Sequence, residues 1–441
     1  MSAAGRLRYL FGVHIAGRAA LRFERLRSEH KMRSRESWRH RHLERPLDVS
    51  PRLKELISRH YLTGRYANGA RKVAWVTSGA PIEVLTALNI FPIYPENHGA
   101  VCGIRRTAEE YCKHAEAAGY SRDLCSYART DIGSILSGKT PVGRLPRPDV
   151  LICCTNICQT VLYWYQVLAH HFGVPLVIID TPFLYREAPS HAVAFVKNQI
   201  EDSIPVLERI AGRSLSHGRL RDVTRMSRDA CELWLRIVES GRMKPSPITA
   251  FDQFIHLAPI VEMRGHRYTV DYYASMLREL NTRVGRGMGA LKDERKRLLW
   301  DNLPIWFRVR WLGDLLAERG VSLVASTYTN AWAELADMID PERPLDSCAS
   351  VYLHPILNRG TGHKLETMKR MIDYYEVDGV LLHSDRSCKP YSIGQLPQRE
   401  SLSSEAGVPA LLIEADHNDP RSFSEEQVRN RLDAFLEVLG V

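Results

Sequence analysis

The chain has 441 residues, of which 44% are hydrophobic and 25% are charged, and its formal net charge at pH 7 is +9. These proportions are typical of a globular protein, and the length favours more than one domain, because a single hydrophobic core rarely serves a chain of this size. No run of apolar residues is long enough to span a bilayer, so we expect no membrane partner.

The first segment, residues 1–70, predicts polar helices interrupted by Pro46 and Pro51. It is strongly basic, with no nucleic-acid-binding motif, so we expect no nucleic-acid partner and favour an amphipathic helix that packs on the body or on a partner subunit. Residues 9–20 lack the form of a secretory signal, which favours a cytoplasmic protein. The basic residues are Arg6, Arg8, Arg18, Arg22, Arg25, Arg27, Lys31, Arg33, Arg35, Arg39, Arg41 and Arg45.

Residues 71–200 predict a first α/β domain in which strands and helices alternate. Segment 95–100, which follows the second strand, is expected to be a loop. The alternation favours a parallel sheet with helices on its faces, where ligands gather at the carboxyl ends of the strands. The predicted strands are 72–77, 91–94, 149–154 and 175–180, and the predicted helices are 82–88, 107–118 and 159–171.

Residues 201–310 predict a helical connecting region, and residues 311–441 predict a second α/β domain. The expected fold class is therefore α/β, with two open, mostly parallel sheets of Rossmann or flavodoxin type. Two similar halves are a weak sign of pseudo-symmetry. In the second domain the predicted strands are 321–326, 378–383 and 409–414, and the predicted helices are 311–319, 365–375 and 424–439.

Nine cysteines in a chain without a secretory signal argue against a disulfide framework and leave buried thiols, a metal or cluster site, or a catalytic thiol. Cys125 lies in a polar segment before a predicted helix, and Cys158 and Cys388 follow predicted strands. Three such thiolates could hold an iron–sulfur cluster with one iron open to substrate. Spacing by itself supports this weakly, because cysteine is often a small buried apolar residue. Cys153 fits that alternative, and Cys154 is ambiguous.

Several stretches from residue 72 to the carboxyl terminus resemble one known family. They are 73–85 (VAWVTSGAPIEVL), 94–100 (YPENHGA), 119–129 (GYSRDLCSYAR), 149–158 (DVLICCTNIC), 378–390 (DGVLLHSDRSCKP), 407–416 (GVPALLIEAD) and 431–437 (RLDAFLE). Together they resemble the benzoyl-CoA reductase and 2-hydroxyacyl-CoA dehydratase family of cluster-bearing subunits. Segment 94–100 resembles the reductase branch in particular.

The resemblance implies that Cys125, Cys158 and Cys388 bind a [4Fe–4S] cluster. Many dehydratases have Asp directly after the second cysteine, whereas this chain has Gln159, which leaves Cys154 and Cys158 as alternatives for the second ligand; we keep Cys158, which follows the strand.

The implied activity is oxygen-sensitive, one-electron chemistry on an acyl-CoA through a ketyl radical. It is either reduction of benzoyl-CoA type or loss of water from a 2-hydroxyacyl-CoA. The implied partners are the acyl-CoA substrate, a homologous second cluster subunit and an ATP-dependent iron–sulfur activator protein. Two further hypotheses are a cluster protein that stores electrons without processing acyl-CoA and a structural subunit without chemistry.

Four residues are candidates for catalytic roles. Ser126 could hydrogen-bond a cluster sulfur or the substrate carbonyl, or it could cap a helix. His98 could be an acid or a coenzyme A contact, or a structural histidine. Arg264 lies in a segment comparable to one in the family, so it could meet substrate or coenzyme A, or it could lie in a helix-entry loop. Glu414 ends a predicted strand and could be an acid or base, or a helix cap. His417, close to it, is undecided in the same way.

Overall fold

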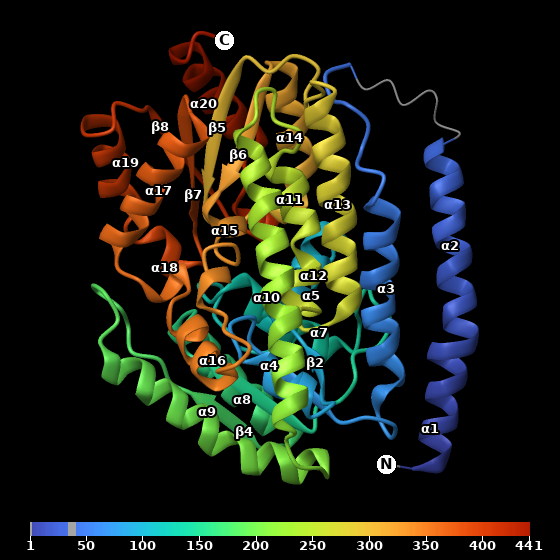
Figure 1. Ribbon diagram of the computed structural model, residues 1–441. Helices are drawn as coiled ribbons and strands as arrows, with labels where there is room; N and C mark the ends of the chain where they lie inside the picture. Colours follow the sequence, from blue (N-terminus) through green and yellow to red (C-terminus); the bar gives the residue numbers. More distant parts are fainter. Residues whose placement is uncertain (1, 34–40) are drawn as a thin grey trace.

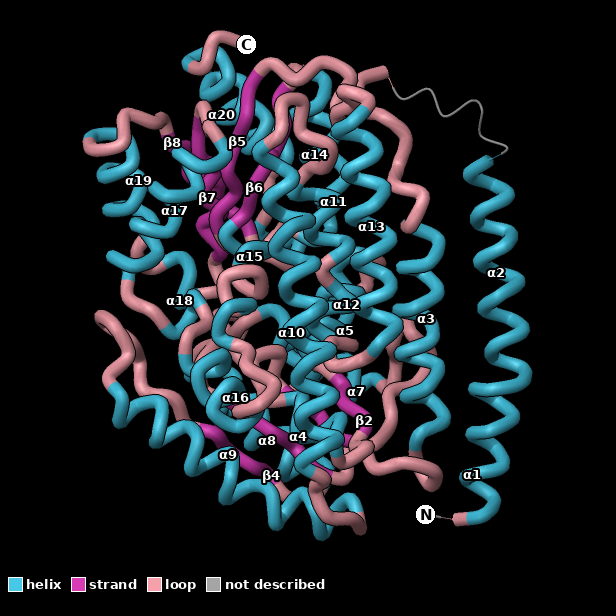
Figure 2. Tube along the Cα trace, viewed as in Figure 1, coloured by secondary structure: helices cyan, strands magenta, loops and turns pink. Residues whose placement is uncertain are grey.

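The structure, a computed structural model, describes residues 2–33 and 41–441, and its core is two separate four-stranded sheets (Figures 1 and 2). All neighbouring strands in both sheets pair in parallel, so the predicted α/β class with two open sheets is confirmed. The first sheet contains β1 (Val73–Val76), β2 (Phe91–Ile93), β3 (Val150–Cys154) and β4 (Leu176–Ile179). The second contains β5 (Lys296–Asp301), β6 (Val321–Ser326), β7 (Gly379–Asp385) and β8 (Ala410–Ala415).

The two sheets have the same strand order. It is β2-β1-β3-β4 in the first and β6-β5-β7-β8 in the second, which is the order at the start of a flavodoxin-like sheet. In each sheet the order reverses beside the first strand, between β1 and β3 or between β5 and β7. Ligands of such sheets bind at this reversal, outside the carboxyl ends of the strands. Each half therefore has one candidate ligand edge, by which we mean the carboxyl ends of its strands at this reversal.

Helices surround both sheets and connect them. Helix α8, for example, follows β3 and ends at Gly173, whose φ of +60° suits glycine better than other residues. The first half has α4 (Ile82–Ala87), α5 (Pro95–Ile104), α6 (Ala108–Ala117), α7 (Ser126–Ser137) and α8 (Gln159–Phe172). The connection has α9 (Ser190–Ala211), α10 (His217–Glu239), α11 (Ala250–His256), α12 (Ala258–Glu262) and α13 (Arg267–Gly285). The second half has α14 (Val309–Glu318), α15 (Thr327–Asn330), α16 (Pro344–Leu353), α17 (Thr361–Tyr375), α18 (Lys389–Ser392), α19 (Gln395–Ser404) and α20 (Glu425–Val438).

Two local predictions differ from the structure. Segment 95–100, expected to be a loop, is the first part of α5. Pro95 stands in its first turn with Glu96, where a missing amide hydrogen and a negative charge are both tolerated. Strand β5 was not predicted, although it pairs with both β6 and β7. The second sheet thus begins inside the range 201–310, and the division of the chain at 70, 200 and 310 stays a prediction.

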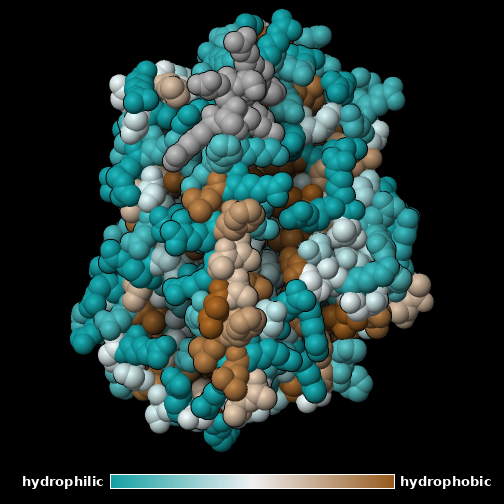
Figure 3. Space-filling model, turned by 90° about the vertical axis from the view of Figure 1, so that its right-hand side faces the viewer, coloured by the Kyte–Doolittle hydropathy of each residue, from teal (hydrophilic) through white to brown (hydrophobic). Residues whose placement is uncertain are grey.

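The N-terminal segment is helical, as expected, and forms a long arm beside the body. It contains α1 (Ala3–Tyr9), the π-helix η1 (Leu10–Ile15), α2 (Ala16–Arg33) and α3 (Ser50–Ala67), and the first three run along α3 at the right of Figure 1. The arm has exposed apolar side chains, among them Leu7, Phe11, Ile15 and Phe23. Figure 3, which views the molecule from the side of the arm, shows a column of apolar residues on that face. Arg35 and Arg39 lie outside the described residues. In the described part of the chain, no helix is long and apolar enough to cross a membrane.

Candidate functional site

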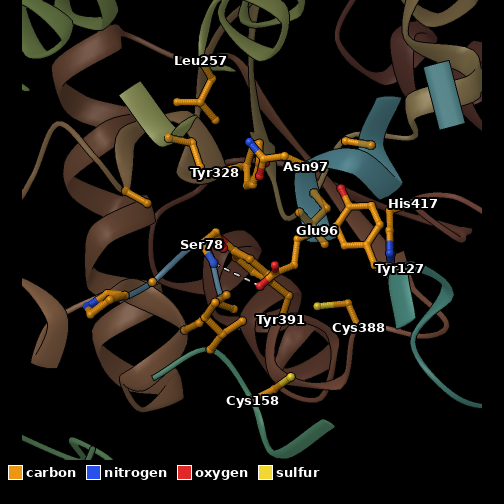
Figure 4. Close-up of a pocket in the computed structure, with 18 of the residues that line it drawn as sticks. Ser78, Glu96, Asn97, Tyr127, Cys158, Leu257, Tyr328, Cys388, Tyr391 and His417 are labelled. Carbon is orange, nitrogen blue, oxygen red and sulfur yellow. Dashed lines mark hydrogen bonds between the residues drawn. The ribbon is translucent and has the colours of Figure 1, made fainter. Parts of the chain in front are cut away.

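A cavity of about 250 Å³ lies where the ligand edges of the two halves meet (Figure 4). From the first half it is lined by residues that follow β1 and β3, such as Ser78 and Cys158. From the second half it is lined by residues that follow β5 and β7, such as Leu303 and Cys388. The cavity therefore occupies the place that the strand order of both sheets indicates for a ligand.

Cys125, Cys158 and Cys388 all line this cavity, and all three thiols are free. Each occupies the same position in its segment, because it is the residue directly before a helix: α7, α8 and α18 respectively. The N-termini of α7 and α8, which are 12 and 14 residues long, favour negative charge at such a position. The sequence-predicted ligand residues are thus brought together at one site.

The environment of Cys158 and Cys388 opposes a free thiolate. Burial raises the pKa of Cys158 to about 12, the nearby Cys125 adds to the rise, and the amides of Thr160 and Val161 act against it. Burial also raises the pKa of Cys388 well above its usual value, with contributions from Asp385 and the other two cysteines. Grouped thiols with raised pKa values lose their protons when a soft metal centre binds, because the cation stabilises the thiolates.

Cys154, the alternative to Cys158, lies elsewhere. It is fully buried as the last residue of β3 and is not among the residues that line the cavity. Its backbone amide donates to Thr77 Oγ1 at 3.0 Å, which fixes it in the sheet. The geometry therefore supports Cys158 as the thiol available to a ligand in the cavity.

Ser126 takes part in a chain of hydrogen bonds that joins the two halves. Its Oγ lies 2.9 Å from Nε2 of His417, and Nδ1 of His417 lies 2.6 Å from Oδ2 of Asp385. The backbone amide of Ser126 donates to Ser387 Oγ at 3.1 Å, and the Ser387 hydroxyl donates to Asp416 Oδ2 at 2.6 Å. His417 also lines the cavity, and its Nε2 lies 3.9 Å from Cys125 Sγ.

This serine–histidine–aspartate sequence does not act as a hydrolase triad. Burial works against charge on His417, but Asp385 and Asp416 raise its pKa well above the usual value, which favours the imidazolium form. An imidazolium donates to Ser126 and cannot take its proton. Ser126 is also fully buried and does not line the cavity. The chain instead presents a positive hydrogen-bond donor beside Cys125.

Asp385, Asp416 and His417 have ligand atoms that all lie within 4.8 Å of one another, a grouping that could hold a metal ion. Their lone pairs already have partners in this structure. Asp416 accepts from Ser387 and from the amides of Asn418 and Asp419, and Asp385 accepts from His417 and the amide of Ser387. The hydrogen bonds account for this group without an ion.

Glu96 is a cavity residue that the sequence interpretation missed. Its side chain is 8% exposed, and burial raises its pKa to about 7. The Ser78 amide donates to Oε1 at 3.1 Å, drawn as a dashed line in Figure 4, and the Tyr165 hydroxyl donates to Oε2 at 3.4 Å. A carboxyl group with a pKa near neutrality can both accept and donate a proton. The available signal was its position shortly after β2, on the edge where ligands were expected.

Most of the remaining cavity wall is apolar or aromatic, a property that excludes bulk water from the site. The Trp306 Nε1 group donates to the Tyr127 hydroxyl, which orients both rings. Tyr328 and Tyr391 from the second half face the same space (Figure 4). The wall thus suits an apolar or aromatic ligand group.

The other three sequence-predicted candidates do not line this cavity. Arg264 is 1% exposed; its guanidinium pairs with Glu83 at 3.2 Å and donates to the Tyr352 hydroxyl. His98 lies in α5 with Nε2 2.7 Å from Thr140 Oγ1, and burial lowers its pKa to about 4. Glu414 is exposed on β8. Their geometry favours structural roles, and no observation tests a catalytic one.

Comparison with known proteins gives a match to the family described as 2-hydroxyglutaryl-CoA dehydratase, D-component, over residues 77–439. The chain belongs to this family. The predicted family is therefore confirmed, and so is an enzyme of the dehydratase or reductase kind.

Three relatives of this D-component family member span nearly the whole matched region. The (R)-phenyllactyl-CoA dehydratase alpha subunit of Clostridium sporogenes is 29% identical, over 89% of this chain and 98% of the relative. The (R)-2-hydroxyisocaproyl-CoA dehydratase alpha subunit of Clostridioides difficile is 30% identical, over 86% and 94%. One subunit of the benzoyl-CoA reductase of Thauera aromatica is also 30% identical, over 88% and 93%. Dehydratase and reductase subunits are thus about equally similar to this chain.

Proposed function

We propose that this chain is the cluster-binding catalytic subunit of a cytoplasmic, oxygen-sensitive acyl-CoA enzyme that works by one-electron chemistry. Cys125, Cys158 and Cys388, which line the cavity, would hold a [4Fe–4S] cluster. The partners are a homologous second cluster subunit and an ATP-hydrolysing activator protein that delivers the electron. The observation that carries the proposal is the meeting of three free thiols, from three separate helix starts, at one apolar cavity between the halves.

The spacing of the thiols supports a cluster over a single metal ion. Four ligands of one zinc ion, with Zn–S bonds of about 2.3 Å, place their sulfur atoms roughly 3.8 Å apart in a tetrahedron. Among the described residues, the group whose ligand atoms all lie within 4.8 Å of one another is Asp385, Asp416 and His417, and it contains no cysteine. At least one pair of the three sulfur atoms is therefore more than 4.8 Å apart. A cluster of several irons bridges such a distance.

When bound, the cluster supplies one electron to the thioester carbonyl of an acyl-CoA. Glu96, with its pKa of about 7, accepts or donates the proton that the reduced substrate exchanges. The aromatic wall around Tyr328 and Tyr391 excludes water and orients the acyl group. His417, whose Nε2 lies 3.9 Å from Cys125 Sγ, would offset negative charge on a cluster held there.

Two reactions fit this arrangement. Reduction of benzoyl-CoA type is favoured by the aromatic wall and by segment 94–100, and the relative of that kind is 30% identical. Loss of water from a 2-hydroxyacyl-CoA is favoured by the dehydratase alpha subunits, of 29% and 30% identity. Both reactions need the same electron delivery and the same proton-exchanging group, so the substrate decides between them.

The test is anaerobic reconstitution of the chain with iron and sulfide, followed by assembly with its partner subunit, activator protein and ATP. Benzoyl-CoA and a series of 2-hydroxyacyl-CoAs are then supplied in parallel. We expect about four irons on this chain and turnover of one substrate class. A folded protein that retains no iron would refute the cluster. Reduction without turnover of either class would favour the alternative of an electron-storing protein.

A further inference from the structure

A second cavity, of about 190 Å³, lies under the N-terminal arm on the side of the first sheet where β2 is the edge strand. Its walls come from α1 and η1 of the arm, from α3, from the segment around Arg71 and Phe91, and from the link between α12 and α13. Figure 1 shows the arm running along α3. Tyr9, Val13 and His14 of the arm form part of the cavity wall. Arg59, His60 and Arg71 precede the region that matches the family, whereas Arg219, Glu262 and His266 lie within it.

Three arginines line this cavity without carboxylate partners. None of Arg59, Arg71 and Arg219 forms an ion pair with any residue in the ranges 2–33 and 41–441. The guanidinium groups are held by neutral neighbours instead: Arg71 lies over the Phe91 ring at 5.3 Å and Arg59 over the Tyr268 ring at 5.5 Å. Arg71 also donates to Asn89 Oδ1 at 2.9 Å, while its buried Nε has no hydrogen-bond partner in the described structure. Such placement leaves positive charge and donor groups available to a ligand.

The pKa values of two histidines in the same wall, His60 and His266, are lowered in part by this positive charge. His60 is 7% exposed. Its pKa is lowered to about 3, by burial and then by His266 and Arg71. The pKa of His266 is lowered to about 4, by burial and then by Arg71, Arg59 and Arg219. Neutral imidazoles still carry one N–H each, which an anion can accept.

A single acidic residue, Glu262, is found among the described residues that line the cavity. Burial raises its pKa to about 7, so it carries little negative charge on the acidic side of neutrality. Glu262 also lines the cavity of the cysteines, so it stands in the wall between the two spaces. The charge balance of the second cavity is therefore strongly positive.

We propose that the arginine-lined cavity under the N-terminal arm binds a phosphate group carried by a small organic molecule. Guanidinium groups match the tetrahedral oxygens of a phosphate through paired hydrogen bonds, and three of them exceed what a carboxylate requires. A cavity volume of about 10–15 Å³ is enough for one water molecule, and this cavity has about 190 Å³. It therefore has room for a phosphate and for part of the molecule attached to it, beside the rings of Phe91 and Tyr268.

The phosphate has two possible sources, the 3′-phosphate of coenzyme A and an independent phosphorylated metabolite or free phosphate. The proposal does not rest on the cluster or on acyl-CoA turnover, because binding is measurable without catalysis. Calorimetric titration of the full-length, anaerobically reconstituted chain with inorganic phosphate, coenzyme A and dephospho-coenzyme A separates the sources. Chloride at matched ionic strength serves as the reference in each titration.

We expect inorganic phosphate to bind the wild-type chain, and Arg71→Gln and Arg59→Gln each to weaken it roughly 10- to 100-fold, as for loss of a charged hydrogen bond. Arg219→Gln, at an exposed position that folding tolerates, should weaken it in the same direction. Arg310→Gln, an exposed arginine of α14, is the matched control and should change nothing. Thermal midpoints of all variants show that each is folded.

Competition decides the source. If coenzyme A displaces phosphate and dephospho-coenzyme A does not, the site takes the 3′-phosphate; if neither displaces it, the ligand is an independent phosphate compound. Both results support the phosphate site. Absence of phosphate and coenzyme A binding to the wild-type chain would overturn it, and so would equal affinity in the wild type and all three cavity variants.

Discussion

Ser126 Oγ lies 2.9 Å from His417 Nε2, and this contact links the start of α7 in the first half to the loop after β8 in the second. Two of the proposed cluster ligands, Cys125 and Cys388, lie next to this contact. Cys125 directly precedes Ser126 in the chain. The Cys388 amide donates to Asp385 Oδ1 at 3.3 Å, and the other carboxylate oxygen of Asp385 contacts Nδ1 of His417. His417 thus connects the segment of Cys125 to the segment of Cys388 through hydrogen bonds.

Replacement of His417 tests this link. In His417→Gln the positive charge near Cys125 is lost while a side chain of similar length remains. We expect the reduction potential of the reconstituted cluster to fall by an amount on the order of tens of millivolts, because an added electron is then less stabilised. Redox titration followed by electron paramagnetic resonance measures it. The exposed His191→Gln is the control, and an unchanged potential at full iron content in His417→Gln would contradict the assignment.

The pair Cys158 and Cys154 offers a matched comparison of two cysteines in neighbouring positions of one segment. Cys158→Ala should lose most of its iron, because the remaining two thiols cannot hold the cluster in place. Cys154→Ala, which removes a thiol that does not line the cavity, should keep its iron and lose a modest amount of stability. Iron and sulfide per chain after anaerobic reconstitution give the answer. The reverse pattern would move the ligand to Cys154.

The pKa of Glu96 predicts a pH dependence of turnover. Burial raises this pKa to about 7, so the group is protonated below that pH and a carboxylate above it. If Glu96 accepts the substrate proton, kcat rises as pH increases through about 7 and then levels off. Glu96→Gln should lower kcat roughly 100- to 10,000-fold and abolish the rise of kcat with pH. It should leave the iron content unchanged.

Glu262 supplies the comparison for Glu96, because burial raises its pKa to the same value, about 7, and it lines the same cavity. Its Oε1 accepts from the Tyr61 hydroxyl at 3.2 Å, which gives it a structural role in the wall. In Glu262→Gln, kcat should still rise as the pH increases through about 7. If the rise disappears in Glu262→Gln and persists in Glu96→Gln, Glu262 is the proton-exchanging group instead.

The sequence predicted those features that depend on local pattern. Apolar runs followed by helical segments located most strands, and the placement of Cys158 and Cys388 after strands put both on the ligand edge. Strand β5 escaped prediction because it begins with Lys296 and Arg297. Arg297 is 4% exposed in the structure and is neutralised there by Glu294 at 2.5 Å, a partner that pattern reasoning cannot assign.

The site was predictable only in part for the same reason. The three cysteines proposed as ligands were recognisable from the segments that resemble the family, not from their spacing. Glu96 and His417 acquire their roles from burial and from partners distant in the chain: Tyr165 for the first, Asp385 and Ser126 for the second. Such contacts exist only after the chain has folded and the two halves have packed together.

Arg264 gives the last prediction, because its geometry separates a structural role from a substrate contact. Its Nε lies 3.2 Å from Glu83 Oε1, both side chains are buried, and the Tyr352 hydroxyl donates to Glu83 Oε2 at 2.7 Å. Arg264→Met leaves the Glu83 charge buried and unpaired, which we expect to cost about 3–5 kcal/mol of stability. The double variant Arg264→Met with Glu83→Gln removes that charge and should recover part of the loss. Chemical unfolding of the three proteins measures both effects. A KM for acyl-CoA that rises in both variants, at undiminished stability, would show instead that Arg264 meets the substrate.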